Sequence, residues 1–280
     1  MKKILLIISL LAAFGLGVLV WFYQNDTVSK PTATEIPAIP TVSAKQAILI
    51  DGKTGECLYE KAADEKGYPA STTKIMTAMV VLDICREQNI SLKEKITVPS
   101  NAEGVEGSSL FLKTGQMKTI ENLLYGIMLV SGNDGATALA SQMGGKTEYF
   151  VQRMNEKAEK IGCTGTHFEN PTGLFSENHY TTARDLANIA RHAMENDDFA
   201  DIVRTRQYKN YYNKNKTIYQ YEGGNGIKIG YTRKSGRTLV ASSERNGTLL
   251  ICVLLSDGNW FNDAYSLMDY GFNIKGCRDE

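Results

Sequence analysis

A serine and a lysine three residues apart form the pattern in this sequence that could activate a nucleophile. Ser71 and Lys74 are the only S-x-x-K pair in the chain. On a helix the two side chains share a face, so a neutral Lys74 amine could take the proton of the Ser71 hydroxyl. The helix N-terminus would stabilise an oxyanion and lower the pKa of the lysine. Composition alone gives about one such pair per chain of this length, and a helix-capping serine beside a solvated lysine has the same pattern.

Two further polar motifs make this pair more specific. Ser131-Gly132-Asn133 lies 60 residues after Ser71 behind an apolar run, and Lys228-Ile229-Gly230 lies 97 residues beyond Ser131. Short polar motifs on separate elements can assemble a site in the cleft between them. Competing copies fit less well, because Lys-Thr-Gly at 53–55 and at 113–115 precedes Ser131, and Ser176-Glu177-Asn178 lies in a loop.

Hydrophobic periodicity and turn residues predict the elements that carry these motifs. A helix is expected from about Ser71 to Arg86, a second after Thr119, and a small-residue helix over 136–143. Further helices are expected over 147–161 and 182–194, capped by Thr147 and Thr182, and over about 260–270. Strands are expected over 47–50 and 57–59 around a turn, and over 238–242 and 248–255 around Asn246-Gly247.

Strands at both chain ends with helices between them predict an α/β chain of the α+β type. One antiparallel sheet would pair the two ends in its middle, and the intervening helices would form a second lobe. The site would then lie in the cleft between the lobes.

The N-terminal residues have the pattern of a membrane anchor. Lys2 and Lys3 precede residues 4–23, which carry no charge and end in aromatic residues typical of a membrane interface. We expect 1–23 to be a retained signal-anchor helix, with a cleaved signal peptide as the alternative. Residues 24–44 read as a Pro/Thr-rich linker, 45–273 as the catalytic domain and 274–280 as a tail.

Composition excludes several classes of protein. Lys plus Arg and Asp plus Glu are both 31, and no basic run exists, which argues against nucleic-acid binding. The five cysteines contain no C-x-x-C pair, so a zinc finger is not expected, and their odd number favours reduced core cysteines over a disulfide framework. The alternative of one or two bridges with a free thiol stays open. The three histidines lack metal-ligand spacing, and no cofactor is expected.

The three motifs together resemble those of low-molecular-mass penicillin-binding proteins, the serine-type D-alanyl-D-alanine carboxypeptidases. The resemblance extends from about Lys45 to Phe272. It includes further collinear segments at 48–55, 69–76, 107–113, 123–126, 170–174 and 182–186. It implies a β-lactamase/DD-peptidase-like fold, in which helices and an all-helical lobe flank a five-stranded antiparallel sheet.

The resemblance also implies roles for residues. Ser71 would attack the peptide carbonyl between two D-alanines with Lys74 as base, and Ser131 would relay the proton to the leaving D-alanine. The backbone N–H groups of Ser71 and Tyr231 would form the oxyanion hole. Asn133 would hold the substrate backbone. Lys228, in the motif that continues through Gly230, would supply positive charge near the substrate carboxylate.

The third motif departs from the family pattern. The family has Lys-Thr-Gly, whose hydroxyl helps to bind the carboxylate, whereas Ile229 has no hydroxyl. Thr232 could substitute for it. Where the family often has an arginine before this motif, the chain has Lys214. Its ammonium is a point charge and lacks the paired N–H groups with which a guanidinium binds a carboxylate. Many relatives add a β-rich domain and a C-terminal anchor, whereas this sequence ends at Glu280.

The sequence therefore predicts a membrane-tethered enzyme at the extracytoplasmic face of a bacterial cell. Its partners would be peptidoglycan stem peptides ending in D-Ala-D-Ala, β-lactams as inhibitors, and the cytoplasmic membrane through residues 4–23. The alternatives are a catalytically weak penicillin-binding wall sensor or scaffold, which Ile229 would favour, and a serine β-lactamase. A stem-peptide endopeptidase or transpeptidase is a near neighbour that these motifs do not separate.

Overall fold

The computed structural model describes residues 38–276 and contains the expected antiparallel sheet. Its strand order is β2-β1-β9-β8-β7, and all neighbours are antiparallel. The strands are β1 (Gln46–Asp51), β2 (Cys57–Lys61), β7 (Gly224–Thr232), β8 (Gly236–Arg245) and β9 (Thr248–Asp257). Strand β1 pairs with β9, Gln46 opposite Leu255, so the two ends of the domain meet inside the sheet, as predicted.

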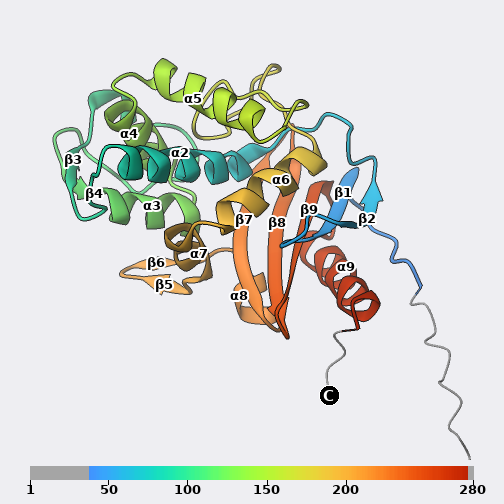
Figure 1. Ribbon diagram of the computed structural model, residues 1–280. Helices are drawn as coiled ribbons and strands as arrows, with labels where there is room; N and C mark the ends of the chain where they lie inside the picture. The colour runs from blue at the N-terminus through green and yellow to red at the C-terminus, as the bar shows by residue number, and fades with distance from the viewer. Residues whose placement is uncertain (1–37, 277–280) are drawn as a thin grey trace, which may run out of the picture. The chain divides into compact units, whose positions relative to one another are not determined.

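Both faces of the sheet are covered by helices (Figure 1). Side chains alternate along β1, so Ile48 joins the core shared with the helices between β2 and β7, whereas Leu49 joins the core beneath α9 (Trp260–Ile274). Strands β1 and β9 are buried on both faces, and the middle of each sequence is accordingly a continuous apolar run. The site must therefore lie at an edge or end of the sheet, where polar groups are accessible.

Helix α2 (Lys74–Glu87) is the centre of the helical part. Eleven of its fourteen residues are buried, which is why its apolar residues show no single face. The helices around it are α3 (Ile120–Leu129), α4 (Asn133–Met143), α5 (Thr147–Lys160), α6 (Ala183–Met194) and α7 (Asp197–Arg204). Smaller elements are η1 (Ala70–Thr73), η2 (Ser100–Ala102) and α8 (Thr217–Gln220). Two small two-stranded sheets pair β3 (Lys95–Thr97) with β4 (Met117–Thr119) and β5 (Gln207–Tyr208) with β6 (Tyr211–Tyr212).

Several boundaries differ from those expected. The first helix begins at Lys74 behind a 3-10 turn, because Ser71 lies in η1, and α4 begins at Asn133. Thr182 caps α6 as predicted, its hydroxyl accepting a hydrogen bond from the backbone N–H of Asp185. The prediction for Thr147 is wrong, since it is the first helical residue of α5 and the cap position is Lys146. The two small two-stranded sheets, α7 and α8 were not expected; the strands of these sheets and α8 are too short to show a period, whereas α7 has an amphipathic pattern that was missed.

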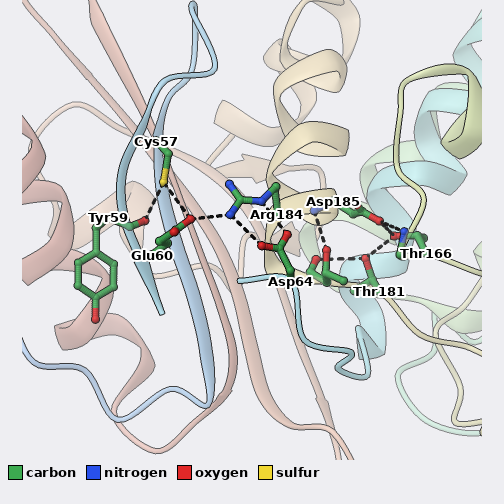
Figure 2. Close-up of polar contacts among 10 residues, drawn as sticks. Cys57, Tyr59, Glu60, Asp64, Thr166, Thr181, Arg184 and Asp185 are labelled. Carbon is green, nitrogen blue, oxygen red and sulfur yellow. Dashed lines mark hydrogen bonds and ion pairs between the residues drawn. The ribbon is translucent and has the colours of Figure 1, made fainter. Parts of the chain in front are cut away.

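The first turn of α6 ties the hairpin β1–β2 to the helical part (Figure 2). Arg184 forms a fork with Asp64, at 2.7 and 3.0 Å, and also reaches Glu60 at 2.5 Å. Beside it Asp185 accepts hydrogen bonds from the backbone N–H of Gly165 and the hydroxyl of Thr166, both at 2.8 Å. The segment 182–186, which carries part of the family resemblance, is therefore a structural clamp.

The packed domain includes the end of the predicted linker. Val42 and Ala44 are buried, and the Ser43 hydroxyl donates to Asp257 at 2.6 Å and lies 2.8 Å from an Asp263 carboxylate oxygen. The predicted anchor, residues 4–23, and Cys277 lie outside the described residues. Within residues 38–276 no helix is long and apolar enough to cross a membrane. The four cysteines of this range (Cys57, Cys85, Cys163 and Cys252) are free thiols.

Candidate active site

The expected serine–lysine pair is formed at the start of α2. The Lys74 Nζ lies 2.9 Å from the Ser71 Oγ. Ser71 is half-buried, whereas Lys74 has no exposed surface. The turn η1 sets this spacing, because its first residue, Ala70, has a positive φ of 50° and the following residues wind directly into α2.

Two carbonyl-type oxygens complete the surroundings of the Lys74 amine. It donates to the Asn133 Oδ1 at 2.7 Å and to the backbone oxygen of Thr172 at 2.6 Å. Burial lowers the pKa of Lys74 well below its usual value; the charge of Lys228 adds to this, and Asp134 opposes it. A neutral amine has two N–H donors, which these oxygens engage, and its lone pair is left for the proton of Ser71. The geometry thus suits Lys74 as a base toward Ser71.

The Ser131-Gly132-Asn133 motif forms the junction of α3 and α4. Ser131 is buried in left-handed backbone with φ 69°, a conformation that non-glycine residues adopt mainly where the surroundings enforce it. Asn133 has both ends of its amide engaged by protein, since its Nδ2 donates to the backbone oxygen of Glu106 at 2.6 Å. The described contacts therefore connect Asn133 to Lys74 and to the loop 106–112.

Asp134 is a residue of this junction that the sequence analysis missed. Its carboxylate accepts from the backbone N–H groups of Leu110 and Leu112, at 2.9 and 3.1 Å, and from the Ser109 hydroxyl at 2.7 Å. It holds the loop 106–112 against the start of α4. The acidic residue directly after Asn133, in the first turn of a helix, was the signal available in the sequence.

The third motif lies on β7, at the edge of the sheet. Lys228 is 1% exposed, and burial, with a contribution from the charge of Lys214, lowers its pKa to about 7. Gly230 lies against η1, since a Cβ at this position would come 2.8 Å from the Ser71 backbone nitrogen. A side chain at 230 would therefore push β7 away from Ser71.

The neighbours of this motif take different positions. Tyr231 is 67% exposed, and Ile229 packs against the core beneath α9. Thr232 lies on the face of β7 shared by Lys228, but its hydroxyl is engaged by that of Ser235 at 2.5 Å. Lys214 lies close enough to lower the pKa of Lys228, and its backbone N–H donates to the carbonyl of Leu129 at 3.0 Å.

The loop 169–179 was assigned no role from the sequence, yet it supplies the carbonyl of Thr172. The Asn170 Oδ1 fixes it by accepting from the backbone N–H groups of Thr172 and Gly173, at 3.1 and 2.8 Å. Gly173 passes so close to η1 that a Cβ would lie 1.8 Å from the Ala70 oxygen. The Asn-Pro-Thr-Gly run was visible, but a backbone carbonyl leaves no mark on residue type.

A buried histidine locks this loop to the serine–lysine turn. The His179 Nε2 lies 2.8 Å from the Thr73 Oγ1, and its Nδ1 accepts from the backbone N–H of Glu169 at 3.1 Å. Because Nδ1 accepts, Nε2 carries the proton and donates it to Thr73. Burial lowers the pKa of His179 to about 4, so the ring is neutral near pH 7.

The sheet, the helical part and the motifs at their junction form a DD-peptidase fold of the penicillin-binding class. The Streptomyces K15 DD-transpeptidase superposes with a TM-score of 0.79 at 33% identity, covering 84% of this chain and 99% of that one. The D-alanyl-D-alanine carboxypeptidase DacD from Francisella tularensis superposes with a TM-score of 0.80 at 26% identity, covering 89% and 75%.

The chain belongs to the D-alanyl-D-alanine carboxypeptidase family, a family of serine-type peptidases, whose model matches residues 31–259. It is 36% identical to the D-alanyl-D-alanine carboxypeptidase DacF of Bacillus subtilis, covering 75% of this chain and 57% of DacF. It is 33% identical to the D-alanyl-D-alanine carboxypeptidase of Streptomyces sp. K15, covering 84% of this chain and 89% of that protein. The chain thus spans somewhat over half of DacF.

Proposed function

We propose that this protein is a serine D-alanyl-D-alanine carboxypeptidase that removes the terminal D-alanine from peptidoglycan stem peptides through an acyl-enzyme on Ser71. The observation that carries the proposal is the position of the Ser71 Oγ, 2.9 Å from a buried Lys74 whose N–H groups have other acceptors. Membership of the carboxypeptidase family supports the reaction and its substrate class.

In the proposed acylation the neutral Lys74 takes the Ser71 proton while the Ser71 Oγ bonds to the carbonyl carbon between the two D-alanines. The backbone N–H groups of Ser71 and Tyr231 hold the oxyanion, an arrangement that the close approach of β7 at Gly230 supports. Ser131 passes the proton to the nitrogen of the leaving D-alanine, and the C–N bond breaks. Water then hydrolyses the ester, and Ser71 regains its proton.

Binding of the substrate carboxylate is assigned to the cations at this end of β7. Lys228 and Lys214 supply the charge, and the pKa of Lys228 is lowered first by burial and further by the charge of Lys214. Thr232 could replace the hydroxyl that Ile229 lacks, because its oxygen can accept from both the N–H and the hydroxyl of Ser235, which leaves its own proton to donate. Asn133 has one amide N–H and one Oδ1 lone pair beyond its contacts with Glu106 and Lys74, and these would contact the peptide backbone.

The test is D-alanine release by the full chain from a peptide ending in D-Ala-D-Ala, beside Ser71→Ala. Release that disappears in Ser71→Ala, together with labelling of Ser71 by a fluorescent penicillin, is the expected result. Labelling of Ser71 without release of D-alanine would contradict the carboxypeptidase and favour a penicillin-binding sensor. Rapid turnover of the penicillin itself would indicate a β-lactamase. Cleavage of cross-linked dimeric stem peptides would show an endopeptidase activity.

Export and tethering are proposed on the sequence of residues 1–23 alone. The uncharged run over 4–23 behind two lysines would hold the protein at the outer face of the cytoplasmic membrane, with the domain outside the cell. Fractionation of cells that express the full chain tests this. The protein should remain with membranes after a high-salt wash, and release of a shortened, soluble chain would instead show cleavage of a signal peptide.

A further inference from the structure

Three side chains meet at one end of the proposed site and are not used by the reaction. The rings of Tyr68 and Phe175 form an edge-to-face pair with centroids 4.9 Å apart, and the Lys234 Nζ lies 5.9 Å from the Phe175 ring centre. Each side chain lies three residues along the chain from a group of the site: Tyr68 precedes Ser71, Phe175 follows Thr172, and Lys234 follows Tyr231.

The contacts that assemble the site also bring these three side chains together. The loop that carries Phe175 is held to η1 at Gly173, and β7 is held to Ser71 at Gly230. The turn that carries Lys234 is closed by hydrogen bonds from Ser235 to the Thr232 hydroxyl. The backbone segments that carry Tyr68, Phe175 and Lys234 are therefore held in place by the contacts of the site.

The direction of the substrate follows from the proposed function, on which this inference rests. The terminal carboxylate would lie by Lys228 and the reacting carbonyl by Tyr231, so the peptide that precedes the scissile bond continues toward Lys234. Three residues of extended chain span about 10 Å. A side chain two or three residues before the scissile bond would thus reach the Tyr68–Phe175–Lys234 group.

The group offers an apolar surface and a positive charge that forms no ion pair within residues 38–276. Phe175 is 41% exposed, and Arg233 and Lys234 are both exposed at the turn. Among the ion pairs of residues 38–276, none includes Arg233 or Lys234. An aromatic face beside a free ammonium complements a side chain with a methylene stem and an anionic end.

We propose that Tyr68, Phe175 and Lys234 form a specificity subsite for the acyl part of the peptide, and that this subsite selects a side chain ending in a carboxylate. The preferred substrate is an anionic stem peptide, and a stem with a free amine at the same position is disfavoured. Since the cation is exposed, the discrimination is modest, about two- to five-fold per charge, and salt weakens it.

Three peptides with one backbone test the subsite on the full-length protein. They are Nα-acetyl-Lys-D-Ala-D-Ala with the lysine Nε succinylated (anionic), acetylated (neutral) or free (cationic). We expect kcat/KM for D-alanine release to fall in that order. Lys234→Gln should bring the three values together, and Lys234→Glu should reverse the order. The matched control is Lys146→Gln, which removes another lysine placed 5.8 Å from a tyrosine ring and should keep the wild-type order.

A second readout separates this inference from the proposed function. Protection of Ser71 from a fluorescent penicillin reports binding of each peptide even where no D-alanine is released. Equal protection and equal release for the three peptides, or an order that persists in Lys234→Gln, would overturn the subsite while the carboxypeptidase stands. A Lys146→Gln variant that behaves like Lys234→Gln would reduce the effect to net charge and also overturn it. Unlabelled Ser71 with no release from any peptide would remove both proposals.

Discussion

Lys74 and Lys228 are both buried, and the positive charge of Lys228 helps to lower the pKa of Lys74. The two amines thus favour opposite states in the proposed reaction, Lys74 neutral as a base and Lys228 charged toward the substrate carboxylate. Lys228 is itself held near its titration point, because burial and Lys214 lower its pKa to about 7.

We expect kcat/KM to follow a bell-shaped pH profile. It should fall as the pH rises through about 7, because Lys228 loses its proton there. It should also fall at low pH as Lys74 becomes protonated. Lys214→Gln removes a repelling charge, so the alkaline limb should move to higher pH. The control Lys216→Gln, at another exposed lysine two residues away, should leave the limb in place. An unmoved limb in Lys214→Gln would contradict the coupling.

Gly230→Ala should impair acylation without unfolding the protein. Its Cβ would come 2.8 Å from the Ser71 backbone nitrogen and 2.5 Å from the Thr238 Oγ1, which forces β7 away from the proposed oxyanion hole. Loss of one oxyanion donor typically costs about 100-fold or more in rate. Gly258→Ala is the control, because its Cβ would meet only the Ser43 Oγ at 3.7 Å. Penicillin labelling rates and melting curves check both variants, and labelling of Gly230→Ala within about two-fold of wild type would count against this geometry.

His179→Ala should weaken both stability and acylation. Loss of the hydrogen bonds to Thr73 and Glu169 frees the loop that holds Lys74, and buried groups left unpaired cost about 1–3 kcal/mol. Urea unfolding at pH 7 and the rate of penicillin labelling measure the two effects. The half-buried His192, on α6, provides the control substitution to alanine. Wild-type labelling in His179→Ala would show that the loop does not depend on this link.

Stability should also depend on pH through His179. Because burial lowers the pKa of His179 from 6.5 to about 4, the unfolded chain binds more protons than the folded one between these values. The contribution is complete above pH 6.5 and is lost as the pH falls through about 4, amounting to about 3 kcal/mol. His179→Ala should flatten this part of the stability profile, and an unchanged slope would assign it to other groups.

Ile229→Thr should improve substrate binding. A hydroxyl at this position restores one hydrogen bond to the carboxylate, about 1.5–3 kcal/mol, or ten-fold and more in KM. Ile229 also packs against the core beneath α9, so the change should lower the melting temperature. Ile229→Val shortens the side chain without adding a hydroxyl, so it separates the effect of the hydroxyl on substrate binding from the effect of the lost packing on stability. Equal KM values in the two variants would mean that position 229 does not face the carboxylate.

The sequence by itself determined the class of fold and the residue types of the candidate site. Continuous apolar runs at both chain ends predicted the central pairing of β1 with β9, because strands buried on two faces need such runs. The S-x-x-K spacing predicted a contact between Ser71 and Lys74, because one turn of helix is enough to make it. Strand burial and the contact within one helical turn depend on neighbouring residues, so the local sequence pattern predicts them.

The tertiary structure decided the groups that surround this pair. Lys74 contacts the carbonyl of Thr172, Leu110 contacts the carboxylate of Asp134, and Thr73 contacts His179. The partners in these contacts are up to about 100 residues apart in the chain, so no local sequence pattern predicts them. Burial is also a property of the whole fold: the sequence predicted a lowered pKa for Lys74 through the helix N-terminus, but not the burial that lowers the pKa values of both Lys74 and Lys228. The direction of the proposed substrate along β7 also depends on the tertiary structure. It follows from the close packing of Gly230 against Ser71, which residue type alone does not predict.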